Sequence, residues 1–498
     1  MSATVTVTPE RAKRSLLNEI LQASALYSLA LIAQRVVGVL LFPLYTHYLA
    51  PSAYGLLDLM DQTVSLWGLL IGAQFSAALF YHYFQDQAAD WRRRVVATTI
   101  LGAAGLGVGS GLLGLAGAAP LSRLLFGTSN YAGYFYLLFA SMAVSFPLEA
   151  CFCWFKATNL AGLFVFSSIL RLVLTIGITA TLLVVYKLGI LAILWGNLIS
   201  GIVLLILMGA YCANRMSFTF DWELFVRMCR FSVPLALTGV AYFIIHFGDR
   251  FVLQRYVSLT ELGVYSAGYK IEMLVSYIHS SFHTYWSAQI YEIVRREDGR
   301  KMFARVFTYM ILVLATCALG LTLFAGPLLA VLATPAYYPA AAIVPVIVAA
   351  YFVRAIGDFF RCLLYVNNRP GLDAFYNWIG AGVGLAGYFL LVPPLGMWGA
   401  AIATLIIFVV IAVIAARSSY KILPWEIEVG RIVKIAVCAA VVLSVRYSLQ
   451  IKSIGMEFVL GLGLLLFFGL LLLLLRFATF GELAAARKAV GTMTRRFA

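Results

Sequence analysis

The sequence predicts an all-α polytopic membrane protein, and three observations support this prediction. The chain has 498 residues, of which 63% are hydrophobic and only 11% are charged. Soluble domains average about 45–50% apolar and about 25% charged residues, so this chain has too few polar side chains for a water-exposed surface. Its apolar residues also form runs long enough to cross about 30 Å of hydrocarbon, which takes roughly 20 helical residues. Finally, the chain repeats itself at a spacing of 208 residues.

Fourteen apolar runs meet the length requirement, so 14 transmembrane helices are predicted. Loops with glycine, proline or charged residues separate them, and none of these loops is long enough for a soluble domain. The predicted spans are 23–46, 55–80, 95–118, 131–157, 163–186, 189–211, 231–255, 263–286, 304–326, 339–366, 372–392, 396–416, 431–448 and 456–476.

Lysine and arginine residues gather in alternate loops, which predicts the orientation. The basic loops at 86–94 and 294–302 are expected in the cytoplasm, whereas the loops at 47–54 and 327–338 contain no Lys or Arg. Both termini are therefore predicted to lie in the cytoplasm. The protein itself is predicted to lie in the cytoplasmic membrane. The net charge of +15 is spread over many loops, which favours anionic membrane lipids and excludes nucleic acid as a partner.

The repeat predicts the domain organisation. A shift of 208 residues places Tyr48–Gly55 on Tyr256–Gly263, and after a one-residue deletion Leu188-Gly189 falls on Leu395-Gly396. Each copy holds six helices, an even number, so the two copies are predicted to be parallel repeats that form two lobes, with a cleft for alternating access. The predicted parts are a cytoplasmic segment 1–19, a first lobe 20–214, a second lobe 215–420, two further helices in 421–478, and a cytoplasmic tail 479–498.

Four cations at middle depths of predicted spans are the candidate binding residues: Arg35, Lys270, Arg171 and Arg354. An ionisable side chain in hydrocarbon costs a few kcal/mol, so it faces a partner or a water-filled cavity. Guanidinium groups bind phosphate bidentately, and a lipid diphosphate is an anion that several such groups could neutralise. The alternative for Arg354 is an ion pair with Asp358, four residues away, and Arg250 is expected to extend towards the interface.

Three carboxylates, Asp58, Asp61 and Asp249, are candidates for binding a coupling proton or sodium ion. The alternative for Asp58 and Asp61 is a solvated rim of the cavity. No catalytic group, metal site or cofactor is predicted, since His279 and His283 lack a third ligand. The stretch Gly105–Gly111 lies inside a predicted span, so close helix packing explains it better than phosphate binding does.

Two regions resemble a known family. Gly248–Leu253 (GDRFVL), followed by Leu262–Lys270 (LGVYSAGYK), is similar to the mid-chain signature of polysaccharide transporters in the multidrug/oligosaccharidyl-lipid/polysaccharide exporter superfamily. Phe42–Leu49 (FPLYTHYL), leading into Pro51–Gly55, resembles the first helix connection of that family.

The resemblance implies a flippase that moves undecaprenyl-diphosphate-linked oligosaccharide from the cytoplasmic to the outer leaflet through a central cationic cavity. Lys270 matches a cationic position of that family, and Arg35 resembles a first-helix arginine of related flippases. The predicted number of fourteen helices also resembles that of the lipid II flippase. In relatives of that flippase, the last two helices line a groove for the lipid tail. The expected partners are a polyprenyl-diphosphate-linked glycan and a polysaccharide polymerase or glycosyltransferases, and the chain is expected to be a monomer.

Two other functions are compatible with a polytopic chain. A multidrug antiporter of the same superfamily would favour an acidic, aromatic cavity over Arg35, Arg171 and Lys270. A membrane-embedded polysaccharide polymerase or glycosyltransferase would need a sizeable extramembrane loop, whereas the longest loops predicted here have about 10 to 20 residues. A transporter that is not an enzyme is therefore the prediction.

Overall fold

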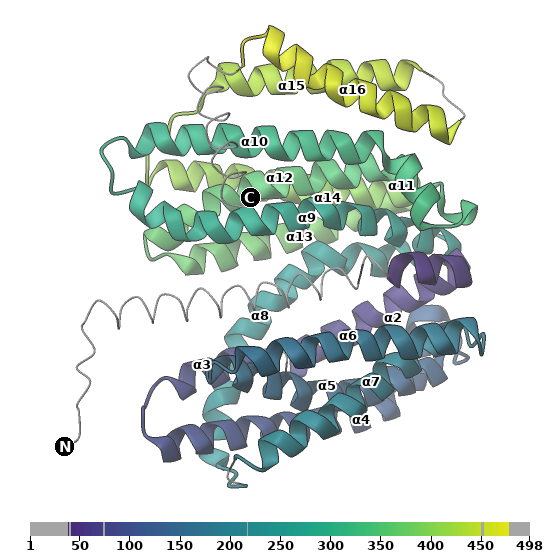
Figure 1. The fold of residues 1–498 in the computed structure, drawn as a ribbon, viewed down its shortest axis with the longest axis vertical. Helices are drawn as coiled ribbons and strands as arrows, with labels where there is room; N and C mark the ends of the chain where they lie inside the picture. Colours follow the sequence, from purple (N-terminus) through teal and green to yellow (C-terminus); the bar gives the residue numbers. More distant parts are fainter. Residues whose placement is uncertain (1–37, 39–40, 73–74, 217, 450–452, 478–498) are drawn as a thin grey trace, which may run out of the picture. The chain divides into compact units, whose positions relative to one another are not determined.

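The structure is a computed structural model, and it describes residues 38, 41–72, 75–216, 218–449 and 453–477. These residues are helical apart from short connections and contain no strand (Figure 1). Eleven of the described helical segments are long and apolar enough to cross a membrane. The predicted first span lies mostly outside the described residues, and the spans predicted at 263–286 and 431–448 are helical but more polar than these eleven. The all-α membrane fold is thus confirmed.

The chain packs into two compact units, Met1–Phe243 and Ile244–Ala498. This division by packing falls inside one helix, α8, whereas the predicted division between residues 214 and 215 follows the repeat. The helices of the N-terminal unit are α2 Pro51–Ile71, α3 Phe75–Tyr83, α4 Ala89–Phe126, α5 Ala132–Ala157, α6 Ala161–Val184, α7 Ile190–Ala213 and the first part of α8 Trp222–Leu253.

The C-terminal unit contains the end of α8, eight further α-helices and a 3-10 turn. They are α9 Leu259–Ile293, α10 Gly299–Leu323, α11 Ala325–Leu332, η1 Pro335–Tyr337, α12 Ala340–Val366, α13 Pro370–Leu395, α14 Met397–Tyr420, α15 Val429–Ser448 and α16 Ile454–Leu474.

The helix boundaries confirm the internal repeat. The helices α2 and α9 begin 208 residues apart, at Pro51 and Leu259, and α5 and α12 begin 208 residues apart, at Ala132 and Ala340. The helices α7 and α14 follow glycines with nearly the same backbone angles, φ 58° and ψ −130° at Gly189 and φ 54° and ψ −129° at Gly396. A positive φ favours glycine, and the spacing of 207 residues between these two glycines agrees with the predicted one-residue deletion.

Small residues allow α4 and α5 to approach closely in the N-terminal unit. A Cβ atom at Gly107 would lie 2.8 Å from the carbonyl oxygen of Ala143, and one at Gly114 would lie 2.3 Å from the ring of Phe139. Within the Gly105–Gly111 stretch, Gly107 and Gly111 pack against Ala143 of α5, as the packing explanation expects, whereas Gly105 and Gly109 have no neighbour within 4 Å.

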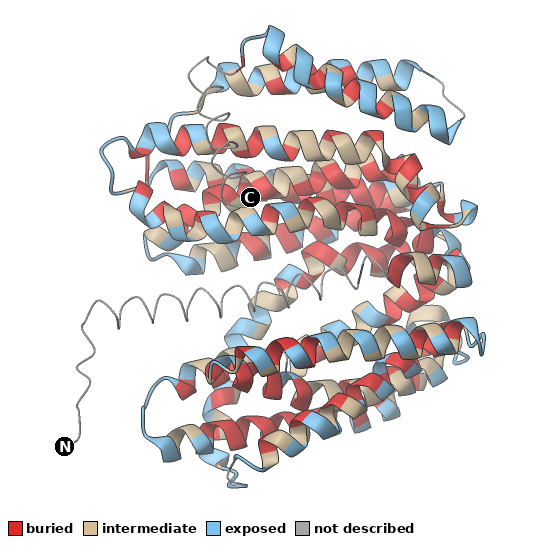
Figure 2. Cartoon of the chain, viewed as in Figure 1, coloured by how far each residue is buried: buried red, intermediate tan, exposed pale blue. Residues whose placement is uncertain are grey.

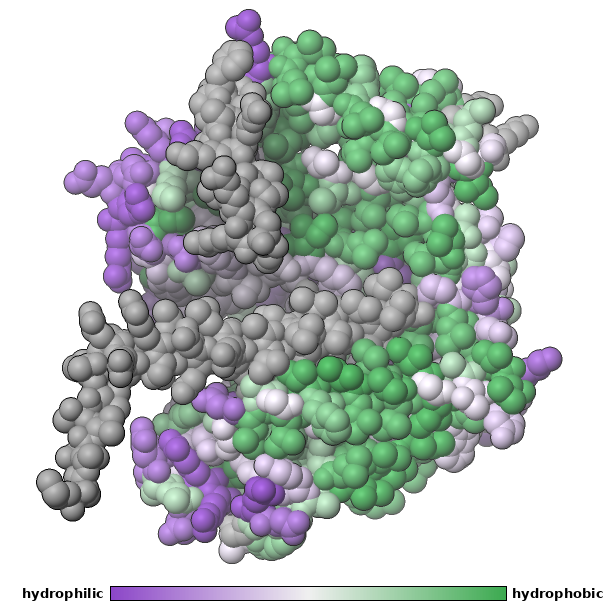
Figure 3. Space-filling view, in the orientation of Figure 1, coloured by the Kyte–Doolittle hydropathy of each residue, from purple (hydrophilic) through white to green (hydrophobic). Residues whose placement is uncertain are grey.

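The C-terminal unit packs around α12, which contacts α9, α10 and α14. The rings of Trp286 on α9 and Phe359 on α12 stack with their centroids 4.4 Å apart. Within each unit the buried residues lie along the faces that neighbouring helices share (Figure 2). Hydrophobic side chains cover the middle of the helices and hydrophilic ones their ends (Figure 3), as expected for helices that span a bilayer.

Candidate functional site

A polar cavity lies among the membrane-spanning helices of the N-terminal unit. Its volume is about 370 Å³. The cavity is lined by Leu41 of the described part of the first span, by Glu149, Phe152 and Lys156 of α5, by Phe164, Ser168, Arg171, Leu172 and Thr175 of α6, and by Asn197 of α7.

Arg171 and Glu149 form an ion pair across this cavity. The guanidinium Nη1 lies 2.9 Å from the Glu149 carboxylate, and the two side chains are 38% and 55% exposed. Arg171 is ten residues after Ala161, the first residue of α6, which places its Cα about 15 Å along the helix. The predicted cavity cation Arg171 therefore lines a solvent-accessible cavity roughly halfway through a span. It is not alone there, because it is paired with the carboxylate of Glu149.

Lys156 adds a second cation to the cavity. Its Nζ lies 4.8 Å from the ring centroid of Phe164, and the side chain is exposed. Of the described residues that line the cavity, two are cations, Lys156 and Arg171, and one is a carboxylate, Glu149. This net positive charge makes the cavity suited to an anion.

The second charged cluster lies in the C-terminal unit, on one face of α12. Asp358 lies 3.5 Å from the Nε of Arg354 and 3.0 Å from an Nη of Arg361. Arg361 also donates to the carboxylate of Asp373 and, at 3.0 Å, to the side-chain oxygen of Asn377. The sequence-predicted cavity cation Arg354 is therefore paired with Asp358, which is the alternative that its spacing suggested.

Asp249 and Arg250 form a buried ion pair near the end of α8, with a distance of 3.0 Å and side-chain exposures of 1% and 4%. The hydroxyl groups of Tyr265 and Tyr269 donate to the second carboxylate oxygen, at 2.5 and 3.1 Å. The expectation that Arg250 extends to the interface is wrong, because this carboxylate and the Tyr269 ring, 4.4 Å from the guanidinium carbon, hold it inside the unit. The coupling candidate Asp249 is thus fully engaged in a buried network.

The other predicted site residues lie in different surroundings. The Lys270 side chain on α9 is half-buried and forms no ion pair or hydrogen bond with another described residue. Asp58, half-buried on α2, lies 3.5 Å from the amide nitrogen of Gln62, and Asp61 is exposed. Arg35 lies outside the described residues, so its role as a cavity cation stays a prediction.

The ion pairs between helices were not predicted from the sequence. Glu149 and Arg171 are on α5 and α6, and Arg361 and Asp373 are on α12 and α13. Their separations along the chain match no spacing within one helix, so only the three-dimensional arrangement could reveal them.

Comparisons with known proteins agree with this architecture. A family model described as "Polysaccharide biosynthesis protein" matches residues 48–342, more than half of the chain. No curated protein sequence matches.

Solved structures show the same fold at low sequence identity. A structure of the lipid II flippase MurJ in an inward closed conformation is similar with a TM-score of 0.72 and 14% identity, over 90% of this chain and 98% of the flippase. An inward-facing multidrug resistance transporter of the MATE family in the MOP superfamily gives a TM-score of 0.65 and 14% identity, over 78% of this chain and 94% of the transporter. An outward-facing MATE transporter gives a TM-score of 0.56 and 14% identity, over 81% of this chain and 95% of the transporter. The chain is a polytopic membrane protein with this flippase and transporter fold.

Proposed function

Since the chain belongs to the polysaccharide biosynthesis protein family, we propose that it is a flippase for undecaprenyl-diphosphate-linked oligosaccharide. It moves the sugar-diphosphate head group from the cytoplasmic to the outer leaflet while the polyprenyl tail stays in lipid. Two lobes that alternately open to each side would perform this movement without covalent chemistry.

The observation that carries the proposal is the cationic cavity of the N-terminal unit. The Arg171–Glu149 pair is solvent-accessible, and exposed ion pairs contribute only about 0–1 kcal/mol. A diphosphate can therefore replace Glu149 as the partner of Arg171 at little cost. Lys156 supplies a second positive charge in the same cavity, and a diphosphate has enough negative charge for both cations.

The same cavity weighs against a multidrug antiporter. A binding site for cationic drugs needs an excess of carboxylates, whereas the described residues that line this cavity have an excess of cations. A polymerase or glycosyltransferase needs room for sugar chemistry outside the membrane. The longest connections between the described helices are 214–221 and 421–428, with eight residues each.

The proposal also includes a location and partners. The protein would lie in the cytoplasmic membrane with both termini inside, as a monomer. Glycosyltransferases would supply its substrate and a polymerase would use its product. The candidate coupling ions are a proton and a sodium ion.

Transport by the full-length protein in proteoliposomes tests the proposal, with a fluorescent polyprenyl-diphosphate oligosaccharide as substrate. The double variant Lys156→Ala/Arg171→Ala should lower the transport rate roughly 100-fold, because each charge-assisted hydrogen bond to phosphate contributes about 1.5–3 kcal/mol. Glu149→Gln should transport at least as fast as the natural protein, because it removes the carboxylate that competes with the substrate for Arg171.

A surface variant with the same loss of charge, Arg295→Ala/Arg296→Ala, is the control and should transport normally, because both residues are exposed. Normal transport by the Lys156→Ala/Arg171→Ala variant would overturn the proposal. The proposal would also be overturned if Glu149→Gln lost transport and the natural protein took up cationic drugs, since that combination indicates an antiporter.

A further inference from the structure

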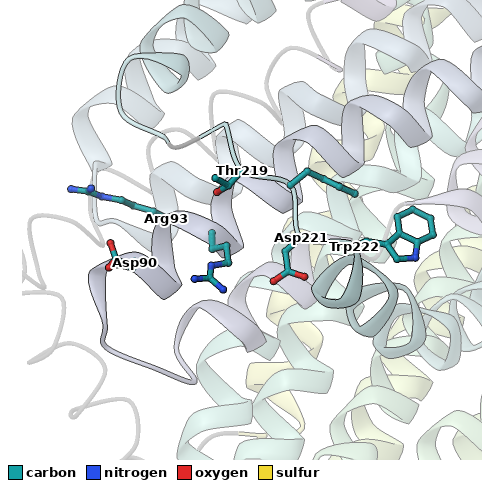
Figure 4. A pocket seen from close by; sticks show the side chains of 7 residues that line it. Asp90, Arg93, Thr219, Asp221 and Trp222 are labelled. Atoms are coloured by element: carbon teal, nitrogen blue, oxygen red, sulfur yellow. The ribbon is translucent and has the colours of Figure 1, made fainter.

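A second pocket lies at one end of the N-terminal unit, separate from the intramembrane cavity. It has a volume of about 570 Å³ and lies between the first turn of α4 and the segment that leads into α8. Asp90 and Arg93 lie on one side of the view and Asp221 and Trp222 on the other, and the side chains of Arg93 and Trp222 extend outwards in opposite directions (Figure 4). Its lining residues are Asp90, Arg93, Arg94, Thr219, Phe220, Asp221 and Trp222.

The two arginines of this pocket have guanidinium groups that are unpaired within the described part of the chain. Arg93 and Arg94 are exposed and form no ion pair or hydrogen bond with another described side chain. Their neighbour Arg92 differs, since its Nε donates to the carbonyl oxygen of Asp86 at 3.3 Å and its guanidinium lies 5.0 Å from the Tyr83 ring centroid. Arg92 therefore holds the loop, whereas Arg93 and Arg94 are available to a ligand.

The carboxylates in the pocket form no ion pair with these two arginines. Asp221 accepts a hydrogen bond of 3.0 Å from the backbone N–H of Leu224, in the first turn of α8, and its own N–H donates to the Thr98 hydroxyl at 3.2 Å. Asp90 lies in the first turn of α4. Two aspartates and two arginines give this lining a formal charge of zero. Each carboxylate is stabilised at a helix N-terminus and forms no ion pair with Arg93 or Arg94, so both guanidinium groups can still bind a phosphate.

Aromatic side chains form the other wall of the pocket. Trp222 is 67% exposed, and its ring centroid lies 6.2 Å from that of Phe220 and 5.6 Å from that of Phe225. On α4 the buried apolar residues begin at Val95, directly after Arg94. Tryptophan and arginine at the end of an apolar run are typical of the lipid headgroup level. The pocket therefore combines a phosphate-binding side with an apolar side at that depth.

We propose that this pocket binds an anionic glycerophospholipid of the cytoplasmic leaflet. The guanidinium groups of Arg93 and Arg94 bind the phosphate oxygens, and the rings of Phe220 and Trp222 contact the glycerol and the upper acyl chain. The lipid thus links α4 to the start of α8, the helix in which the two compact units divide. This site does not depend on the transported substrate, because it shares no lining residue with the intramembrane cavity.

A binding assay on the full-length protein in detergent tests the proposal. Phosphatidylglycerol with a fluorophore on one acyl chain is titrated, and its polarisation is measured. The variant Arg93→Gln/Arg94→Gln should bind at least about ten-fold more weakly, because it loses charge-assisted hydrogen bonds to the phosphate. Arg93→Lys/Arg94→Lys should bind more tightly than the Gln variant, because it keeps the charge.

The repeat provides a matched control at the start of α10. Arg300 and Lys301 lie 208 residues after Arg92 and Arg93 and are also exposed in the first turn of their helix. The variant Arg300→Gln/Lys301→Gln should change the affinity by about two-fold at most, because its charges act on the lipid only through screened solvent. Size-exclusion profiles that match the natural protein exclude misfolding of either variant.

Several results would overturn the proposal. Equal losses in the two Gln variants would indicate diffuse attraction to a basic surface, and no loss in either would exclude phosphate binding by Arg93 and Arg94. Equal affinity for phosphatidylcholine would exclude a preference for anionic lipid. Displacement of the labelled lipid by an equal concentration of glycerol phosphate would assign the pocket to a soluble phosphate.

Discussion

Replacing Asp249 by Asn should strongly destabilise the C-terminal unit. The carboxylate of Asp249 pairs with Arg250 at 3.0 Å and accepts from the hydroxyls of Tyr265 and Tyr269 at 2.5 and 3.1 Å. Asn has nearly the same shape but no charge, so Arg250 loses its paired carboxylate, while contacts such as that to the carbonyl oxygen of His246, at 3.2 Å, and to the Tyr269 ring remain. Breaking a buried ion pair on one side costs about 3–5 kcal/mol because the other charge stays uncompensated. We expect Asp249→Asn to lower the free energy of unfolding by an amount in this range.

Unfolding in mixed detergent micelles, followed by circular dichroism against the fraction of sodium dodecyl sulfate, measures this loss. Glu292→Gln is the control in the same unit, because Glu292 is 72% exposed and lies 4.0 Å from Arg296. Such a surface pair contributes about 0–1 kcal/mol, so this variant should unfold almost like the natural protein.

The double variant Asp249→Asn/Arg250→Gln separates the charge effect from loss of packing. Its loss of unfolding free energy should be smaller than the sum of the losses in the two single variants, because neither partner is left as an isolated buried charge. If Asp249→Asn lost less than about 1 kcal/mol, or if the double variant lost the full sum, the reasoning from an uncompensated charge would be refuted.

Three other predictions concern the topology, the repeat and the first span. Cysteines placed in the loops at 86–94 and 294–302 should react only with reagents that reach the cytoplasm, and labelling from outside would contradict the orientation. In an experimental structure, residues 20–211 and 228–416 should superpose by a rotation of about 180° around the membrane normal, and an axis in the membrane plane would exclude parallel repeats. Arg35→Ala should abolish flipping while leaving protein abundance unchanged, and Arg35→Lys should keep some activity; normal transport by Arg35→Ala would show that this cation is only structural.

The fold could be predicted because hydrophobicity alone defines membrane spans, but the helix ends could not. The span predicted at 95–118 is part of α4, which runs from Ala89 to Phe126. The span predicted at 263–286 is part of α9, which runs from Leu259 to Ile293. Apolar runs report the thickness of the hydrocarbon, whereas a helix continues into the interface as long as its backbone hydrogen bonds are satisfied there.

Ion pairs within one helix could be predicted from the sequence, whereas ion pairs between helices could not. The Arg354–Asp358 contact follows from a spacing of four residues, and the structure contains it. The Arg171–Glu149 pair joins two helices, and no spacing rule relates its members. Arg250 illustrates the same limit, because tyrosines of another helix complete its buried surroundings.

The pairing of the charges separates residues that hold each unit together from residues that can bind a ligand. Arg250 and Arg361 have short contacts to carboxylates and are largely buried, so an incoming phosphate would have to displace a partner inside the protein. Lys156 and Arg171 line a cavity in which the carboxylate is half-exposed, so water already competes for their charges. A substrate that changes sides must bind reversibly, and weakly paired cations meet this need better than saturated ones. The substrate site of the N-terminal unit is therefore expected at Lys156 and Arg171, although Lys156 was not among the cations selected from the sequence.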